Sequence, residues 1–433
     1  MIKNILGTTG TRILNALINL AILILLTREI GSAGFGVIMI ILIAITIIQL
    51  LIDLVAGSAI IYFSSRTELV KLLIPSYIWI GFVIALAWAV FSVLRIYAVD
   101  IYNLIVPDNY ETDILILAFL NALMLTNYNL LLGKKRIGIY NVIFTIQILT
   151  LFFTLLYRMF FMQDVSIDAW VFSVYCAYGM GFILSFIAVI HKIGNLKLEG
   201  TYNVVKQVFY FGLVTQLANI LHIANKRISF YFLKMLTGLS SVGVYGAGTQ
   251  LTEGLKLIGQ SISLVQFSEI SNSNNKDYAI NITIKLMKFS VLLTTVAVTM
   301  LLIIPTKFYG LIFGSDFTDL KYLIIALSPG VIALSSNTIF SHYFSGLGRP
   351  VVSLWANGIG FFITITFAIL LIPPFGYIGA AVTASASYIS SVVYQYFVFK
   401  NETGVKFKQW MPKKNDFRDF GKIVVGLIKK ERV

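Results

Sequence analysis

The chain has 433 residues, of which 58% are hydrophobic and only 12% charged, and its mean hydropathy is +0.87. Soluble domains carry about 25% charged residues, so this composition excludes a soluble enzyme, a secreted mini-protein and a disordered regulator. The formal net charge is +14, and the single cysteine, Cys176, excludes a disulfide framework and cysteine-rich metal sites.

Twelve segments are long and apolar enough to cross a bilayer as helices, each of which needs about 20 residues. Their apolar runs are continuous, whereas the strands of a membrane barrel alternate with a period of two. We therefore expect an all-α, polytopic membrane protein with about twelve transmembrane helices. The predicted spans are 8–27, 37–61, 72–94, 113–132, 138–160, 169–190, 206–228, 241–265, 286–304, 322–344, 351–372 and 379–399.

Basic residues concentrate in the N-terminus, in the loops that follow the even-numbered spans, and in the tail 401–433. The positive-inside rule then places both termini in the cytoplasm. Within the tail, apolar residues at helical spacing alternate with lysines, which predicts a basic amphipathic helix on anionic lipid; a solvated tail is the alternative. No loop is long enough for a catalytic domain, and no phosphate-binding G-x-x-x-x-G-K motif occurs, so we expect neither a cofactor nor enzymatic activity.

A weak internal repeat divides the chain. The segment around Gly36 matches the segment around Gly243 at an offset of 207, and the loop at Gly133 resembles the loop at Gly346. A polar break near 191–203 separates the halves. We predict an N-terminal six-helix bundle over 1–198 and a C-terminal six-helix bundle over 199–400, followed by the tail. An even number of helices in each half implies a pseudo-two-fold axis along the membrane normal.

Four short motifs carry a resemblance to a known family. They are Arg28-Glu-Ile-Gly-Ser-Ala-Gly-Phe-Gly-Val, Ala224-Asn-Lys-Arg-Ile-Ser-Phe-Tyr-Phe-Leu, Gly238-Leu-Ser-Ser-Val-Gly-Val-Tyr-Gly-Ala-Gly and Gln250-Leu-Thr-Glu-Gly-Leu. With the spans and loops, they resemble the Wzx-type polysaccharide biosynthesis flippases of the multidrug/oligosaccharidyl-lipid/polysaccharide exporter superfamily. The resemblance covers nearly the whole chain.

This resemblance implies a bacterial inner-membrane protein that moves an oligosaccharide linked to undecaprenyl diphosphate, such as an O-antigen, capsule or exopolysaccharide unit, by alternating access. It also implies membrane lipids, a proton or sodium gradient, and glycosyltransferases or a polymerase as partners, with no role for nucleic acid. The chain departs from many relatives in one place: it carries Lys226-Arg227 where they have an acidic residue near the end of the seventh span. A role in binding an anionic substrate is therefore easier to support there than cation coupling.

A polar headgroup can cross the hydrocarbon of a membrane only through a water-filled passage. Polar and charged residues inside the spans are therefore the candidates for the lining of that passage. The cations expected to bind a diphosphate are Arg12, Arg28, Lys226, Arg227 and Lys256. The candidates for ion coupling are Asp53, His222 and Glu253, and the polar lumen candidates are Asn15, Asn19 and Asn219. At the offset of 207, Arg12 aligns with Asn219, Asn15 with His222 and Asn19 with Lys226, so polar positions recur on equivalent helices.

Plainer interpretations remain for these residues. Arg12 and Arg28 can extend to lipid headgroups, and Glu253 and Lys256, three positions apart, can neutralise each other within one helix. Three other functions are also weighed: a drug or metabolite exporter of the same superfamily, a membrane polysaccharide polymerase, and a scaffold. The excess of cations disfavours the exporter, the short outer loops disfavour the polymerase, and the intramembrane charges disfavour the scaffold.

Overall fold

The computed structural model describes residues 2–64, 66–191, 200–271, 276–349, 351–405 and 409–410. Throughout these ranges the regular structure is helical and no strand occurs, as predicted. The helices are α1 (Ile2–Ala56), α2 (Ser58–Ser64), α3 (Val70–Tyr97), α4 (Val99–Ile105), α5 (Glu111–Gly133), α6 (Ile137–Leu156), η1 (Tyr157–Phe161), α7 (Ile167–Ile190), α8 (Thr201–Thr237), α9 (Leu239–Ser271), α10 (Lys276–Ile303), α11 (Thr306–Phe313), η2 (Ser315–Phe317), α12 (Leu320–Gly346) and α13 (Val351–Thr403).

Every predicted span overlaps a long helix, although 37–61 runs past the end of α1 into α2. In the described part of the chain, eight helices are long and apolar enough to cross a membrane, and they account for ten of the twelve predicted spans, with two each on α1 and α13. The other two spans, 206–228 and 241–265, fall on α8 and α9, which are not among those eight. Helices α1 and α13 are both bent at a glycine, α1 at Gly31 and α13 at Gly376. The predicted fold class, an all-α polytopic membrane protein, is confirmed.

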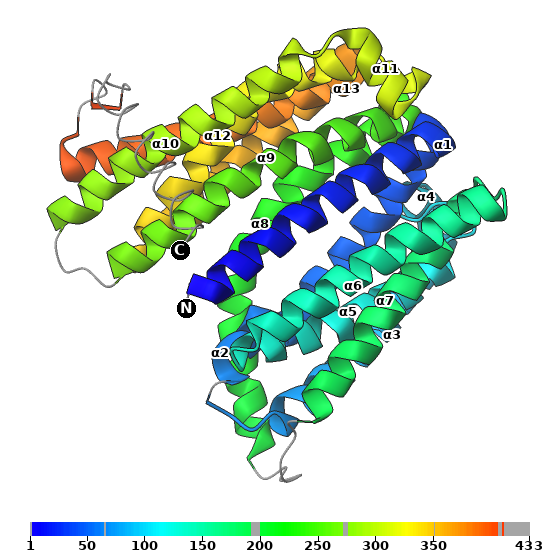
Figure 1. The fold of residues 1–433 in the computed structure, drawn as a ribbon, viewed down its shortest axis with the longest axis horizontal. Helices are drawn as coiled ribbons and strands as arrows, with labels where there is room; N and C mark the ends of the chain where they lie inside the picture. The colour runs from blue at the N-terminus through cyan, green and yellow to red at the C-terminus, as the bar shows by residue number, and fades with distance from the viewer. Residues whose placement is uncertain are drawn as a thin grey trace. The chain divides into compact units, whose positions relative to one another are not determined.

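The protein divides into two compact units. Unit 1 contains Met1–Ile223, Leu233–Gly246 and Gly310–Phe317, and unit 2 contains Ala224–Phe232, Ala247–Tyr309 and Thr318–Val433. In unit 1, α1 packs on α3, α5 and α6, and α7 packs on α5 and α6 (Figure 1). The domain boundary expected at 198–199 stays a prediction.

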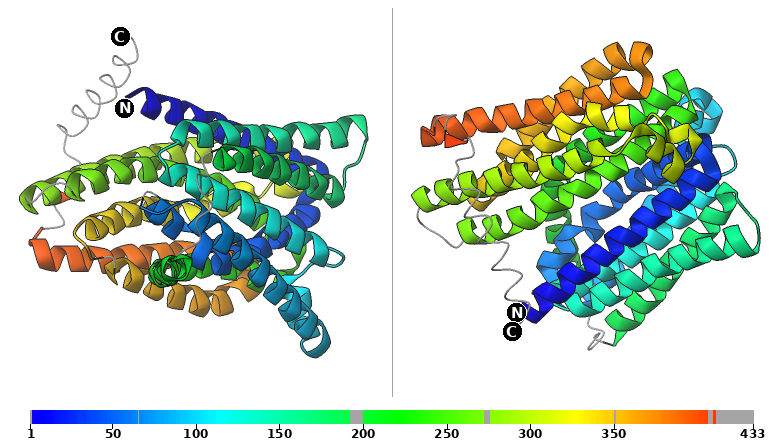
Figure 2. Two further views of the ribbon diagram at one scale, coloured as in Figure 1. Left: turned by 90° about the horizontal axis from the view of Figure 1, so that it is seen from below. Right: turned by 45° about the horizontal axis from the view of Figure 1, so that its top comes forward.

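In unit 2, α12 packs against α10 and α13. The chain of α13 doubles back at Gly376, so that its two arms run antiparallel (Figure 2). Hydroxyls join the arms: Ser387 Oγ donates to the carbonyl of Gly360 at 2.8 Å, and Ser391 Oγ donates to the carbonyl of Ala356 at 2.8 Å. Small and hydroxyl-bearing residues are what close helix packing in lipid requires, because burial of apolar area gives little driving force there.

The internal repeat reappears in the backbone. Gly31 and Gly238, which are 207 positions apart, have nearly the same dihedral angles, φ 76° and ψ 178° against φ 86° and ψ 178°. Lys135 and Gly348, at equivalent places in the second pair of matched loops, both have positive φ, 58° and 74°. Positive φ is uncommon and is adopted mainly by glycine. Its recurrence at equivalent positions therefore indicates that the two halves of the chain share one topology.

Gly36 and Gly243 also meet in space, within unit 1. A Cβ on Gly36 would lie 2.0 Å from the carbonyl oxygen of Leu239, and a Cβ on Gly243 would lie 1.9 Å from the carbonyl oxygen of Ser32. Ser32 and Leu239 are themselves related by the offset of 207, so the contact is reciprocal, as a two-fold axis between the segments would make it. A packing role for these glycines follows from the two distances, because only glycine leaves room for the facing backbone.

We therefore expect Gly243→Ala to destabilise the protein by about 1–3 kcal/mol, because its methyl group would overlap a carbonyl oxygen that cannot rotate away. Gly254→Ala, on the same helix, is the matched control, since a Cβ there meets no atom within 4 Å. That change should be neutral or stabilising by up to about 1 kcal/mol. Thermal unfolding in detergent measures both, and equal melting temperatures for the two variants would contradict the packing argument.

The carboxylate of Asp316 caps the part of α1 that begins after the break at Gly31, although the two residues are far apart in the sequence. Asp316 Oδ2 accepts hydrogen bonds from the backbone N–H of Ser32 at 3.0 Å and from its hydroxyl at 2.8 Å, and Ser32 Oγ lies 2.6 Å from Ser240 Oγ. The break at Gly31 leaves the Ser32 N–H without a partner in the preceding turn, so an acceptor is needed there. The Ser32 backbone bond, followed by its hydroxyl bond, lowers the pKa of Asp316 below its ordinary value.

Because the folded pKa of Asp316 is depressed, its ionised form contributes stability above the ordinary value of 3.8, and this contribution is lost as the pH falls through the lower folded pKa. We expect Asp316→Asn to be less stable than the wild type at neutral pH and to lose less on acidification. Melting temperatures measured between about pH 7 and pH 3 test this. Parallel curves for the two proteins would show that the carboxylate charge does not matter.

Candidate functional site

An ion pair joins two predicted site residues inside unit 2. Lys226 Nζ on α8 lies 2.9 Å from Glu253 Oε1 on α9, and the two side chains are 9% and 30% exposed. A buried ammonium requires a compensating charge, which Glu253 provides. The structure therefore brings together one candidate for substrate binding and one candidate for ion coupling.

Arg227 lies next to this pair in the sequence. Its guanidinium carbon is 5.6 Å from the ring centroid of Phe230, and its Nε is buried without a hydrogen-bond partner among the described residues. The contact with the ring holds the arginine, while one N–H of its guanidinium stays available to an acceptor. A phosphate oxygen is such an acceptor.

A polar cluster beside Lys226 was missed by the sequence analysis. The side-chain oxygen of buried Asn225 accepts hydrogen bonds from the hydroxyls of Thr364 and Ser387, the latter at 2.9 Å. Both hydroxyls belong to α13, which Gly360 allows to come close: a Cβ there would lie 2.9 Å from Asn225 Nδ2. These bonds fix α8 against α13 within unit 2. The available signal was the position of Asn225 immediately before Lys226, inside a span.

A second polar cluster lies in unit 1 around Asp53. Gln49 Nε2 donates to Asp53 Oδ1 at 2.7 Å, and Asn121 Nδ2 donates to Gln49 Oε1 at 3.3 Å. From α8, Gln216 Nε2 donates to the Asp53 carbonyl at 3.3 Å, and Asn219 Nδ2 donates to Gln216 Oε1 at 3.0 Å. Two predicted residues, Asp53 and Asn219, are thus linked through Gln216, which the sequence analysis did not select.

This cluster borders a cavity of about 410 Å³ whose wall also includes Asn129, Leu125 and Gly57. Asn129 Nδ2 donates to the carbonyl of Ala56 at 3.1 Å, so its amide is held at the wall. A carboxylate and three amides present both donors and acceptors, which suits hydroxyl groups or a cation. The described residues that line this cavity include no cation, so the cavity does not match the predicted diphosphate site.

The other predicted residues are dispersed. Asn15 is buried, and its Oδ1 has no hydrogen-bond partner among the described residues; Asn19 is exposed. Arg28 is also exposed, with Nε 4.0 Å from Glu29 Oε1. His222 is half-buried on α8. Arg12 and Lys256 belong to α1 and α9, but their side chains lie outside what the structure describes, as do residues 411–433 of the tail.

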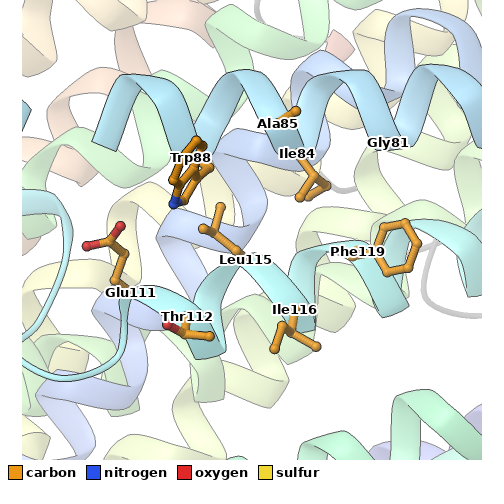
Figure 3. Close-up of a pocket in the computed structure, with 9 residues that line it drawn as sticks. All are labelled: Gly81, Ile84, Ala85, Trp88, Glu111, Thr112, Leu115, Ile116 and Phe119. Atoms are coloured by element: carbon orange, nitrogen blue, oxygen red, sulfur yellow. The ribbon is translucent and has the colours of Figure 1, made fainter. Parts of the chain in front are cut away.

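Another cavity in unit 1, of about 550 Å³, has a different character. It lies between α3 and α5, where Trp88 and Gly81 face Leu115 and Phe119 (Figure 3). Its one carboxylate, Glu111, already accepts from Tyr102 Oη at 2.6 Å and lies 3.3 Å from Arg95 Nη1. The remaining lining is largely apolar, so this groove suits hydrocarbon and not a saccharide.

The fold of the chain is similar to that of two solved membrane proteins. The lipid II flippase MurJ, in an inward closed conformation, aligns over 99% of this chain and 97% of its own, with a TM-score of 0.73 and 14% identity. An inward-facing multidrug resistance MATE family transporter of the MOP superfamily aligns over 90% and 94%, with a TM-score of 0.70 and 13% identity. The chain is therefore a multi-pass membrane protein with this transporter fold.

Curated sequences agree with the predicted resemblance. The chain is 26% identical over 178 residues to the probable low-salt glycan biosynthesis flippase Agl15 of Haloferax volcanii, which covers 39% of this chain and 36% of the relative. It is 22% identical over 214 residues to the capsular polysaccharide biosynthesis protein CapF of Staphylococcus aureus, covering 48% and 54%. The chain thus matches between 36% and 54% of the length of these relatives. No family model matches the sequence.

We expect Lys226→Met to lower the free energy of unfolding by about 2 kcal/mol, because it leaves the Glu253 carboxylate without its cation. The double variant Lys226→Met/Glu253→Gln should recover part of this loss, since it removes both charges together. Thermal unfolding of the wild type, both single variants and the double variant gives the coupling energy. Strictly additive losses would mean that the pair contributes nothing.

Proposed function

We propose that the chain is a flippase that moves a lipid-linked oligosaccharide, carried on a polyprenyl diphosphate such as undecaprenyl diphosphate, across the cytoplasmic membrane by alternating access. The main support for this proposal is the Lys226–Glu253 ion pair. It joins two predicted spans and places a nearly buried ammonium next to a carboxylate. The transporter fold and the glycan-related names of the sequence relatives support the same proposal.

The physical need for such a pair follows from the cargo. A sugar diphosphate cannot cross about 30 Å of hydrocarbon without polar groups that replace water. Cations at membrane depth offer that replacement, but an uncompensated cation there is costly. Pairing with Glu253 compensates the charge of Lys226 and holds its side chain in place while no substrate is bound.

In the proposed mechanism, Lys226 exchanges partners. A diphosphate oxygen approaching Lys226 Nζ competes with Glu253 Oε1, and the free Nε–H of Arg227 adds a second donor. Glu253, displaced from Lys226, is the proposed carrier of the coupling proton. Substrate binding and proton uptake are thereby linked at one pair.

Other candidates have supporting roles in this proposal. Asp53 and His222 stay proposed as ion-coupling groups, and Arg12, Arg28 and Lys256 as further cations along the passage. We propose that both termini face the cytoplasm, and that glycosyltransferases and a polymerase act on the carrier before and after this step. Asn15, Asn19 and Asn219 are proposed as neutral polar lining.

A second candidate, an exporter of drugs or metabolites, is favoured by one observation, the TM-score of 0.70 with a MATE family transporter. A site for organic cations needs a carboxylate with no cation beside it, and Asp53 offers one, since the described lining of its cavity includes no cation. Glu253, by contrast, lies 2.9 Å from Lys226, and the charge at that pair favours an anionic cargo.

The test uses the native host with the gene deleted. Surface glycan should fall and lipid-linked oligosaccharide should accumulate, and the wild-type gene should reverse both effects. Lys226→Met should restore less than about one tenth of the glycan, since it removes the charge that meets the diphosphate. Glu253→Gln should keep substrate binding but lose the dependence of flipping on an imposed proton gradient.

Lys307→Met is the matched control, because it removes an exposed lysine on α11 and should leave the surface glycan unchanged. Ethidium efflux from the same cells tests the exporter. Normal glycan from Lys226→Met at normal expression would contradict the flippase proposal, and efflux that depends on Glu253 but not on Lys226 would favour the exporter.

A further inference from the structure

The cavity of about 410 Å³ beside Asp53, which lies within unit 1, is lined by amide side chains whose orientation the protein fixes. Gln216 Nε2 donates to the backbone carbonyl of Asp53 at 3.3 Å. Asn129 Nδ2 donates to the backbone carbonyl of Ala56 at 3.1 Å. A carbonyl only accepts hydrogen bonds, so both amides must present their nitrogens to the backbone. Asn219 is then fixed as well, because its Nδ2 donates to Gln216 Oε1 at 3.0 Å.

Three side-chain oxygens at this cavity accept no hydrogen bond from the residues that the structure describes. One is Oδ2 of Asp53, whose Oδ1 is bonded to Gln49, and the others are the amide oxygens of Asn129 and Asn219. None of the three is among the buried side-chain atoms without a partner, so each is accessible to a bound molecule. The nitrogens of Asn129 and Asn219 each keep a second N–H as well, because only one of the two is bonded to the protein. The cavity therefore offers both acceptors and donors to a ligand.

This pattern suits the hydroxyl groups of a sugar. A hydroxyl has one donor and two acceptor lone pairs, so it can bond both to the oxygens and to the remaining N–H groups. Leu125 and Ile61 add apolar surface to the wall, against which the C–H groups of a sugar ring can pack. The volume of the cavity lies within the range of sites for small organic molecules.

Cations match the same cavity less well. A metal ion would use only the oxygens, would be repelled by the N–H groups and would fill only a small part of the volume. An organic cation would pair with Asp53, but the described lining residues include no aromatic ring to cover its charge. A neutral molecule rich in hydroxyls therefore uses more of the cavity than a cation does.

We propose that this cavity is a saccharide subsite, in which hydroxyl groups of a sugar donate to Asp53 Oδ2 and to the amide oxygens of Asn129 and Asn219. The remaining amide N–H groups donate to oxygens of the same sugar. This assignment rests on the proposed function, which supplies a saccharide cargo, and it names the residues that recognise the sugar part of that cargo. The diphosphate takes no part in the subsite, because the described lining holds no cation.

The experiment compares two lipids that differ only in the sugar. One is undecaprenyl diphosphate, and the other is undecaprenyl diphosphate that carries a disaccharide of N-acetylglucosamine. Native mass spectrometry of the purified full-length chain in detergent measures the affinity for each. The wild type should bind the disaccharide form about tenfold more tightly, which is the effect of about two net hydrogen bonds. Lys226→Met should weaken the binding of both lipids and leave this preference unchanged, because its charge is proposed to meet the diphosphate.

Asp53→Asn places a donor where the free acceptor was, because Gln49 continues to hold the side-chain oxygen on the other side. It should lower the preference for the disaccharide form about threefold. Asn219→Leu removes an amide from the wall, should have an effect of similar size, and tests the subsite if Asp53→Asn fails to fold. Gln207→Leu is the control, because it removes an exposed amide from α8 and should leave the preference unchanged.

Equal affinity of the wild type for the two lipids would overturn the subsite and leave the flippase proposal standing. An unchanged preference in Asn219→Leu and in any folded Asp53→Asn would do the same. A wild type that binds neither lipid would contradict the proposed function and overturn the subsite with it. Tetraphenylphosphonium that displaces the disaccharide form from the wild type but not from Asp53→Asn would assign the cavity to organic cations and would likewise overturn the subsite.

Discussion

The cost of placing a charge in hydrocarbon governs the arrangement of the polar residues in this protein. An ammonium at membrane depth persists only where a carboxylate or an anionic ligand compensates it. Lys226 meets this condition through Glu253 at 2.9 Å. Other buried polar side chains follow a weaker form of the same rule, since Asn225 and Asp53 each accept hydrogen bonds from neighbouring side chains.

The same constraint explains why small residues recur where helices meet. Without a strong hydrophobic drive between helices in lipid, close approach of backbones and hydroxyl hydrogen bonds must hold them. The reciprocal contact of Gly36 and Gly243 and the hydroxyl bonds between the arms of α13 are two instances. In the proposed flippase, such individually weak contacts can separate and re-form during the transport cycle.

Each of the two units contains its own kind of polar chemistry. The ion pair and Arg227 offer positive charge, whereas the cavity beside Asp53 offers a carboxylate and amides. A saccharide diphosphate contains both an anionic and a hydroxyl-rich part, so the proposed cargo has chemistry suited to each.

The sequence alone determined the spans, because about 20 continuous apolar residues leave a chain few choices other than a membrane helix. The sequence also identified the repeat, because two pairs of glycines are separated by 207 positions for physical reasons. Gly36 and Gly243 must be glycine to allow backbone contact, and Gly31 and Gly238 adopt positive φ. Tertiary structure alone decided the partners. Spacing predicted a neighbour for Glu253 on its own helix, Lys256, whose side chain lies outside what the structure describes. The contact with Lys226 on α8 could not be predicted in this way, because the rotation and register of two packed helices follow from many side chains at once. For the same reason Asn225, Gln216 and Asn129 carried no strong signal in the sequence: their roles depend on which helices surround them.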